Sequence, residues 1–317
     1  GCDPTPCEDA LARCQADCAD GQGERCRALA ALHLSASSEA TSDAVVKADP
    51  GRAARLYRAG CDAGDLPACV ALADLHDRGI GVVRDDGRVF GLLERACAGG
   101  DWAACGRQGQ RLRDGVGVIA DAAAGTKLLD RACEHGDADS CVALSRGDTA
   151  LMAPERRIWL LRKACELEPG EACSALGALH ESGAGVMVDP AEAARLYERA
   201  CGAGVAAGCG GLAALVADGR GVRRDEERAG QLRDRACEGG HAPSCAALAT
   251  TLARISDHPR DAALVNSLFQ RACDADHAEA CHALADRARR GLGRDADPAL
   301  ARDLDRRACE QGHLQAC

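Results

Sequence analysis

The stretch CVALADLHDRGIGVVRDDGRVFGLLERACAGGDWAAC, residues 69–105, decides the fold of this 317-residue chain. Leucine and alanine recur in it at steps of three and four residues on both sides of a Gly-Ile-Gly turn. This spacing is typical of two short amphipathic helices joined by a tight connection. The stretch closes with Cys97 and Cys105, eight positions apart, so that Cys105 opens the next helix pair.

The cysteine spacing continues along the chain. The first cysteines of successive pairs advance by 36 residues from Cys61 to Cys309, apart from one step of 32. A fixed period of this length predicts an all-α fold, an α/α solenoid forming a right-handed superhelix of about eight to nine helix-turn-helix repeats. The nine pairs are Cys18 and Cys26, Cys61 and Cys69, Cys97 and Cys105, Cys133 and Cys141, Cys165 and Cys173, Cys201 and Cys209, Cys237 and Cys245, Cys273 and Cys281, and Cys309 and Cys317.

Two further residue types recur at fixed positions in the repeats and support the prediction of helix pairs. An aspartate recurs four positions after the second glycine of each Gly-x-Gly turn, where an N-cap residue would open the second helix. Pro190 and Pro298 follow it at the first helical position. Leucine occupies the fifth position before the first cysteine of eight pairs: Leu56, Leu92, Leu128, Leu160, Leu196, Leu232, Leu268 and Leu304.

The cysteine pairs predict disulfides between neighbouring repeats. Eight positions along one helix rise about 12 Å, whereas a disulfide needs Cα atoms about 4.4–6.8 Å apart, so the chain must turn between the two cysteines. Glycine-containing segments such as 98–100 and 202–204 supply that turn. The alternative is zinc, which uses shorter Cys-x2–4-Cys pairs. Cys14 and Cys18 have that spacing, but no such pair is repeated along the chain. Disulfides are favoured, and they imply an oxidising compartment.

Composition excludes several classes of protein. Aromatic residues make up 2% of the chain, which disfavours an all-β fold. The net charge of −10 disfavours a nucleic-acid partner. No apolar stretch approaches the 18 residues of a membrane span.

The registers of leucine, alanine, glycine and cysteine resemble Sel1-like repeats, the α/α relatives of tetratricopeptide repeats, as in residues 69–105 and 173–209. The cysteine pair across each inter-repeat loop resembles the disulfide-rich subgroup typified by the Helicobacter cysteine-rich proteins. The resemblance covers residues 18–317, which are predicted to form the array, with residues 1–17 as an N-terminal segment carrying a capping helix. It implies a scaffold that binds protein or peptide partners.

Three cysteines precede the nine pairs. The dipeptide Gly1-Cys2 resembles the cut point of a bacterial lipoprotein signal, so we predict lipidation of Cys2. We further predict that Cys7 pairs with Cys14. The array ends on Cys317 and is expected to lack a C-terminal cap. The expected location is the bacterial cell envelope, as a periplasmic or outer-membrane lipoprotein, or outside the cell.

An enzyme is the alternative that the family resemblance raises, because some members of the subgroup carry a β-lactamase or penicillin-binding label. A serine enzyme of that type needs Ser-x-x-Lys, but Ala44, Ala124 and Leu160 precede the three lysines at that spacing. No His-x-His zinc motif occurs. We therefore predict no catalytic residue, metal or cofactor, and a purely structural envelope protein is the third alternative.

The predicted binding face is the concave side of the solenoid, lined by the first helix of each repeat. Its mixed charges suit a protein or peptide, with cell-wall material as a further candidate ligand. The candidate residues are Asp74, Arg78, Gln110, Asp114, Arg146, Ser182, Asp218, Thr250, Arg254, Asp286 and Arg290.

Histidines and aromatic residues fall into registers. We predict His33, His76 and His180 as packing residues and His241, His277 and His313 as solvated loop residues. Five aromatic residues are predicted in the core (Tyr57, Phe90, Trp159, Tyr197 and Phe269), with Trp102 exposed in a loop.

Overall fold

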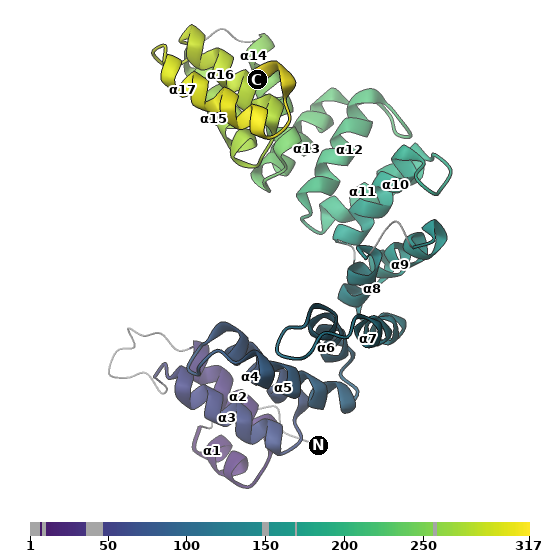
Figure 1. Ribbon diagram of the computed structural model, residues 1–317, viewed down its shortest axis with the longest axis vertical. Helices are drawn as coiled ribbons and strands as arrows, with labels where there is room; N and C mark the ends of the chain where they lie inside the picture. The colour runs from purple at the N-terminus through teal and green to yellow at the C-terminus, as the bar shows by residue number, and fades with distance from the viewer. Residues whose placement is uncertain (1–6, 8–10, 36–46, 148–151, 169, 256–258) are drawn as a thin grey trace. The chain divides into compact units, whose positions relative to one another are not determined.

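The computed structural model describes residues 7, 11–35, 47–147, 152–168, 170–255 and 259–317. Across these residues the chain forms seventeen α-helices and one short 3-10 helix, and no strand (Figure 1). The all-α fold and the solenoid of stacked helix pairs that the sequence predicts are confirmed. None of the helices in the described part combines the length and apolar content that crossing a membrane requires.

The helices form two compact units, Gly1–Thr149 and Ala150–Cys317. Unit one contains α1 (Leu11–Ala19), α2 (Gly23–Ser35), α3 (Pro50–Asp62), α4 (Leu66–Arg78), α5 (Asp86–Ala98), α6 (Trp102–Asp114), α7 (Ala122–Glu134) and α8 (Ala138–Ser145). Unit two contains α9 (Pro154–Leu167), α10 (Glu171–Ser182), α11 (Pro190–Gly202), α12 (Ala206–Asp218), α13 (Glu226–Glu238), α14 (Ala242–Ile255), α15 (Pro259–Asp274), α16 (Ala278–Arg290), α17 (Pro298–Glu310) and the 3-10 helix η1 (Leu314–Ala316). From α2 onward the first helix of each repeat is even-numbered and the second is odd-numbered. The division into residues 1–17 and 18–317 stays a prediction.

The Gly-x-Gly turns end the first helices and lead into the second. The first glycine takes the left-handed conformation that a helix end favours, as at Gly115 with φ of 72°. The recurring aspartate then caps the next helix, as at Asp121, whose Oδ1 accepts a hydrogen bond of 2.9 Å from the Ala124 amide. In the repeat between Cys141 and Cys165, which lacks this turn, α9 begins at Pro154.

The second glycine of the turn packs one repeat against another. A Cβ atom on Gly117 would lie 2.1 Å from the Asp86 carbonyl oxygen, at the start of α5 in the preceding repeat. Gly81 approaches Pro50 in the same way, at 2.2 Å from its carbonyl carbon. The turn is therefore an inter-repeat contact as well as a connection.

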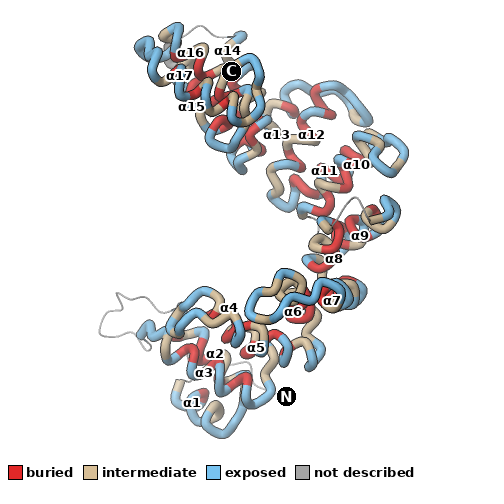
Figure 2. Tube along the Cα trace, viewed as in Figure 1, coloured by how far each residue is buried: buried red, intermediate tan, exposed pale blue. Residues whose placement is uncertain are grey.

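Each unit buries its core between first and second helices (Figure 2). Leu129 and Leu93 are fully buried at the fourth position before the first cysteine, and Tyr57, Tyr197 and Phe269 occupy the same register. Trp159 lies two positions earlier in its repeat and is 41% exposed, so its prediction as a core residue is wrong. Polar residues occupy that earlier register in most other repeats, because it faces away from the core.

Nine disulfides join cysteines eight positions apart, with Cα atoms separated by 4.5–5.0 Å. Except at the C-terminal pair, each bond connects the end of one helix to the start of the next, across the tight loop between repeats. The nine bonds join Cys18 to Cys26, Cys61 to Cys69, Cys97 to Cys105, Cys133 to Cys141, Cys165 to Cys173, Cys201 to Cys209, Cys237 to Cys245, Cys273 to Cys281 and Cys309 to Cys317.

A tenth disulfide lies at the N-terminal end of the described residues. It joins Cys7 and Cys14, with Cα atoms 5.7 Å apart. Both cysteines are buried and pack with Leu29 of α2, so the bond joins Cys7 to α1 where α1 lies against the first repeat. Cys2, the predicted site of lipidation, lies outside the described residues.

An arginine two positions before the first cysteine reinforces these junctions in unit two. Arg271 Nη2 donates to the Cys237 carbonyl oxygen at 2.6 Å, and Arg199 and Arg307 make the equivalent bonds to Cys165 and Cys273. Each accepting carbonyl lies at the C-terminal end of a helix, where a cation is favoured. The side chain therefore ties one second helix to the second helix of the preceding repeat.

Replacing Arg271 by methionine is expected to lower the free energy of unfolding of unit two by about 1 kcal/mol, because a hydrogen bond from a charged donor is lost at a half-exposed site. Arg235→Met is the matched control. Arg235 has the same register, but no described residue accepts a hydrogen bond from its side chain, so its effect should stay below about 0.5 kcal/mol. Urea unfolding of the oxidised chain measures both, and equal effects would contradict the tie.

Candidate functional site

The residues predicted for the binding face lie on first helices, from α4 to α16, except Arg146, which directly follows α8. They are divided between the two units. Several of them form ion pairs or hydrogen bonds with nearby residues. Asp74 forms an ion pair of 2.5 Å with Arg107, and Asp286 one of 3.2 Å with Arg290. The Ser182 and Thr250 hydroxyls donate to carbonyl oxygens of their own helices. The face as a whole stays a prediction.

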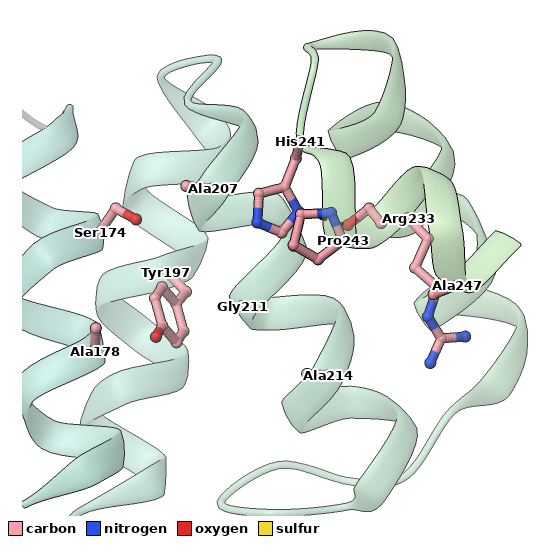
Figure 3. Close-up of a pocket in the computed structure, with 12 residues that line it drawn as sticks. Ser174, Ala178, Tyr197, Ala207, Gly211, Ala214, Arg233, His241, Pro243 and Ala247 are labelled. Carbon is pink, nitrogen blue, oxygen red and sulfur yellow. Dashed lines mark hydrogen bonds between the residues drawn. The ribbon is translucent and has the colours of Figure 1, made fainter. Parts of the chain in front are cut away.

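A hollow of about 480 Å³ opens on the first helices of unit two, across α10, α12 and α14 (Figure 3). Its walls are mostly small side chains, and α11 and α13 each contribute one large polar side chain from behind. The lining residues are Ser174, Ala178, Tyr197, Ala207, Gly210, Gly211, Ala214, Arg233, His241, Pro243, Ser244 and Ala247.

The hollow exists because small residues replace an ion pair. In unit one, Arg107 on α6 meets Asp74 on α4, at the second and fifth positions after the respective cysteines. In unit two the same two registers hold Gly211 and Ala178, and, one repeat later, Ala247 and Ala214. Space filled by a salt bridge in unit one is therefore open in unit two.

Tyr197 forms one fixed wall. A Cβ atom on Gly211 would lie 2.6 Å from its ring, so only glycine lets α12 pack against this tyrosine. The hydroxyl donates to Glu181 Oε2 at 2.9 Å, and Arg220 donates to the other carboxylate oxygen at 3.0 Å. Burial, followed by the hydrogen bond and charge of Glu181, raises the pKa of Tyr197 above its ordinary value, so the phenol stays neutral and keeps its proton.

His241 forms the opposite wall. Its ring lies against Gly210, where a Cβ atom would be 2.4 Å away, and its Nδ1 is 2.8 Å from Ser244 Oγ. His241, His277 and His313 directly precede helices, and they are half-buried. The Nδ1 of His277, for example, accepts the Ala280 amide at 3.2 Å. Their prediction as solvated residues is therefore wrong.

The other histidine register agrees with the prediction of packing residues. His33 and His76 are buried and donate through Nδ1 to the Lys47 and Val83 carbonyl oxygens, both at 3.0 Å. His180 is half-buried. The predicted loop residue Trp102 stacks on His135, with ring centroids 3.8 Å apart, and is half-buried instead of exposed.

Arg233 gives the hollow a positive charge. It occupies the fourth position before Cys237, a core register that holds leucine or an aromatic residue in most repeats. Its side chain is 19% exposed, and it meets Glu226 at 3.5 Å, a carboxylate that is itself 64% exposed. None of the twelve described lining residues is acidic. The sequence signal that could have revealed Arg233 is this charge in an apolar register.

Six segments of the chain match the Sel1 repeat family: residues 29–65, 66–101, 103–137, 170–205, 206–241 and 278–313. They cover more than half of the sequence. The chain belongs to the Sel1 repeat family.

Solved structures show the same fold for this Sel1-repeat protein. A protective antigen of uropathogenic Escherichia coli strains with an SLR fold, c5321, is 20% identical with a TM-score of 0.76; the match covers 96% of this chain and 65% of that one. A Sel1 repeat protein from Oxalobacter formigenes is 20% identical with a TM-score of 0.66, over 97% of this chain and 88% of that one.

Helicobacter pylori cysteine rich protein B is 31% identical over 38% of this chain and 88% of its own, with a TM-score of 0.33. No curated protein matches the chain. Within the described residues of the Sel1 array, no group of three or more His, Cys, Asp or Glu side chains is placed to hold a metal ion.

The environment of His241 predicts a pH dependence of stability. Burial, followed by the charge of nearby His277, lowers the pKa of His241 in the folded chain. The unfolded chain therefore binds the proton more readily, and the contribution of His241 to stability is complete above about pH 6.5 and is lost as the pH falls below it. In urea unfolding, His241→Gln should lose less stability than the unaltered chain between pH 7.5 and 5.0. An identical loss in both proteins would contradict this assignment.

Proposed function

We propose that this Sel1-repeat protein is an extracytoplasmic scaffold that binds a protein or peptide partner through its first helices. The observation that carries the proposal is the hollow on α10, α12 and α14, which combines small apolar walls with a few fixed polar groups. Ligand sites in proteins have this composition and a volume of about 300–1,000 Å³. Cell-wall material is a second ligand class for the same surface.

The disulfides support the location. Bonds of this kind persist in oxidising compartments and are rare in the cytosol, and this array has one at almost every repeat junction. We propose the bacterial cell envelope, with a lipid on Cys2 as the means of attachment, or release from the cell. Trypsin accessibility of the protein in intact and in permeabilised cells tests the location.

The hydrolase alternative gains no support from the hollow. Ser244 and His241 lie at hydrogen-bonding distance, but Ser244 is only 4% exposed and faces Nδ1 from the first turn of α14. Asp137 and Ser140 form the same contact at the same register of α8. The Ser244–His241 pair is therefore a helix-capping contact, and its hydroxyl is not placed to attack a substrate.

An affinity capture from bacterial envelope extract tests the scaffold function. The bait is the full oxidised chain, and the control is the same chain after reduction and alkylation. We expect a polypeptide that is retained by the oxidised bait and crosslinks to first helices in a defined complex. If both baits retain the same material, the folded array binds nothing specific, and the structural-protein alternative takes the place of this proposal.

A further inference from the structure

We infer that the hollow on α10, α12 and α14 binds an extended peptide through one apolar side chain and a neighbouring carboxylate, with Arg233 as the partner of the carboxylate. This inference rests on the proposed scaffold function and narrows it to one site and one ligand chemistry. It is independent of which protein in the cell carries the peptide.

The shape of the hollow indicates an extended segment. It crosses three first helices, and packed helices lie about 8–10 Å apart. An extended chain advances about 3.3 Å per residue, so about six residues would span the hollow. The alanines at positions 178, 214 and 247 leave room for an apolar side chain between the Tyr197 ring and Pro243 (Figure 3).

The charge distribution indicates an acidic peptide. The chain carries 49 acidic residues against 39 basic ones, yet none of the twelve described lining residues is acidic. Arg233 is mostly buried where most other repeats place a core apolar residue, and its contact to the exposed Glu226 is long, at 3.5 Å. A ligand carboxylate can replace that contact with a shorter charge-assisted hydrogen bond.

The walls of the hollow are already fixed. Glu181 holds the Tyr197 hydroxyl, and Ser244 lies beside the His241 ring. Ser174 on α10 presents a further hydroxyl at the edge, suited to the backbone of a peptide. Such preorganisation reduces the conformational entropy that binding must overcome.

Short peptides test the site directly. We would titrate the full oxidised chain, labelled with ¹⁵N, with N-acetylated and C-amidated hexapeptides containing Leu-Asp, Leu-Asn, Leu-Lys or Ala-Asp at the centre. The Leu-Asp peptide should shift the amide signals of Gly210 and Gly211 and bind with a Kd on the order of 0.1–1 mM. The Leu-Asn, Leu-Lys and Ala-Asp peptides should each bind about tenfold more weakly or not at all.

Two substitutions separate the two contacts. Ala214→Leu fills the hollow from an exposed helix position and should weaken binding of the Leu-Asp peptide at least about tenfold. Arg233→Leu restores the residue type of its register and should abolish the preference for Leu-Asp over Leu-Asn. The matched controls are Ala123→Leu on α7 and Arg235→Leu on α13, both at exposed positions outside the hollow. Circular dichroism confirms that each variant is folded.

The outcomes distinguish this inference from the scaffold function. Equal affinity for the Asp and Lys peptides, shifts confined to residues outside the hollow, or no effect of Ala214→Leu would overturn the inference. A partner from the envelope capture that binds Ala214→Leu as tightly as the unaltered chain would retain the scaffold function and remove this site. Weaker binding of the Leu-Asp peptide to Ala214→Leu and loss of the preference for Leu-Asp over Leu-Asn in Arg233→Leu, with neither effect in the two control variants, support the inference.

Discussion

Reduction of the disulfides is expected to unfold the repeat array. In the chain-entropy account, a bridge closing about nine residues contributes roughly 2.5 kcal/mol, and a folded domain has a net stability of about 5–15 kcal/mol. The helices are rich in alanine and poor in aromatic residues, so they bury little apolar area to offset the loss. Far-UV circular dichroism at 25 °C, before and after addition of a phosphine reductant, measures the effect.

Single bridges allow a matched comparison. Replacing Cys201 and Cys209 together by alanine should lower the free energy of unfolding of unit two by about 2.5 kcal/mol. The same change at Cys309 and Cys317 should have a smaller effect, because this bond joins α17 to the residue after the short 3-10 helix η1 and does not tie two α-helices together. Full native helicity after reduction, with all thiols titratable, would contradict the structural role of the bridges.

Gly117→Ala is expected to lower the free energy of unfolding of unit one by about 3–4 kcal/mol. The turn would hold the alanine in a left-handed conformation, which is unfavourable for a residue with a side chain. Its methyl group would also lie 2.1 Å from the Asp86 carbonyl oxygen, so the two repeats must separate. The backbone of α5 cannot yield as the end of a flexible side chain could. Thermal and urea unfolding of the oxidised variant measure the loss.

Gly100→Ala is the control for this close approach. Gly100 also has a positive φ, of 95°, but no atom lies within 4 Å of its added Cβ. Gly100→Ala should therefore lower the free energy of unfolding only by the cost of the left-handed conformation, about 1–2 kcal/mol. If Gly117→Ala and Gly100→Ala lose the same stability, the Gly-x-Gly turn is a connection and does not hold neighbouring repeats together.

The regular spacing of leucine, glycine and cysteine predicted most of the fold, because each repeat packs against its neighbours through the same positions. The aspartate before α7 and the proline that begins α9 mark helix starts through local chemistry alone. Trp159 shows where this reasoning fails: its residue type suggests burial, but its register places it outside the core. Burial in a helix depends on angular position, and a shift of two residues turns a side chain about 200° around the helix axis.

The hollow was not predicted from the sequence, because it is formed by small residues that carry no functional group. Ala178 and Ala214 occupy the register of the predicted binding face, but their small size, not any functional group, opens the space. Arg233 could have been found, since it stands where most other repeats have leucine or an aromatic side chain. The contact of Tyr197 with Gly211 joins separate repeats, and spacing within one repeat does not reveal it.

Disulfide mapping of the intact oxidised chain tests the central claim most directly, namely that cysteines eight positions apart join neighbouring repeats of an extracytoplasmic scaffold. Non-reducing peptide mass spectrometry should find the nine pairs together with the bond between Cys7 and Cys14, and thiol titration in denaturant should find at most one free thiol, that of Cys2. Three or more free thiols, or bonds between cysteines of distant repeats, would contradict the account.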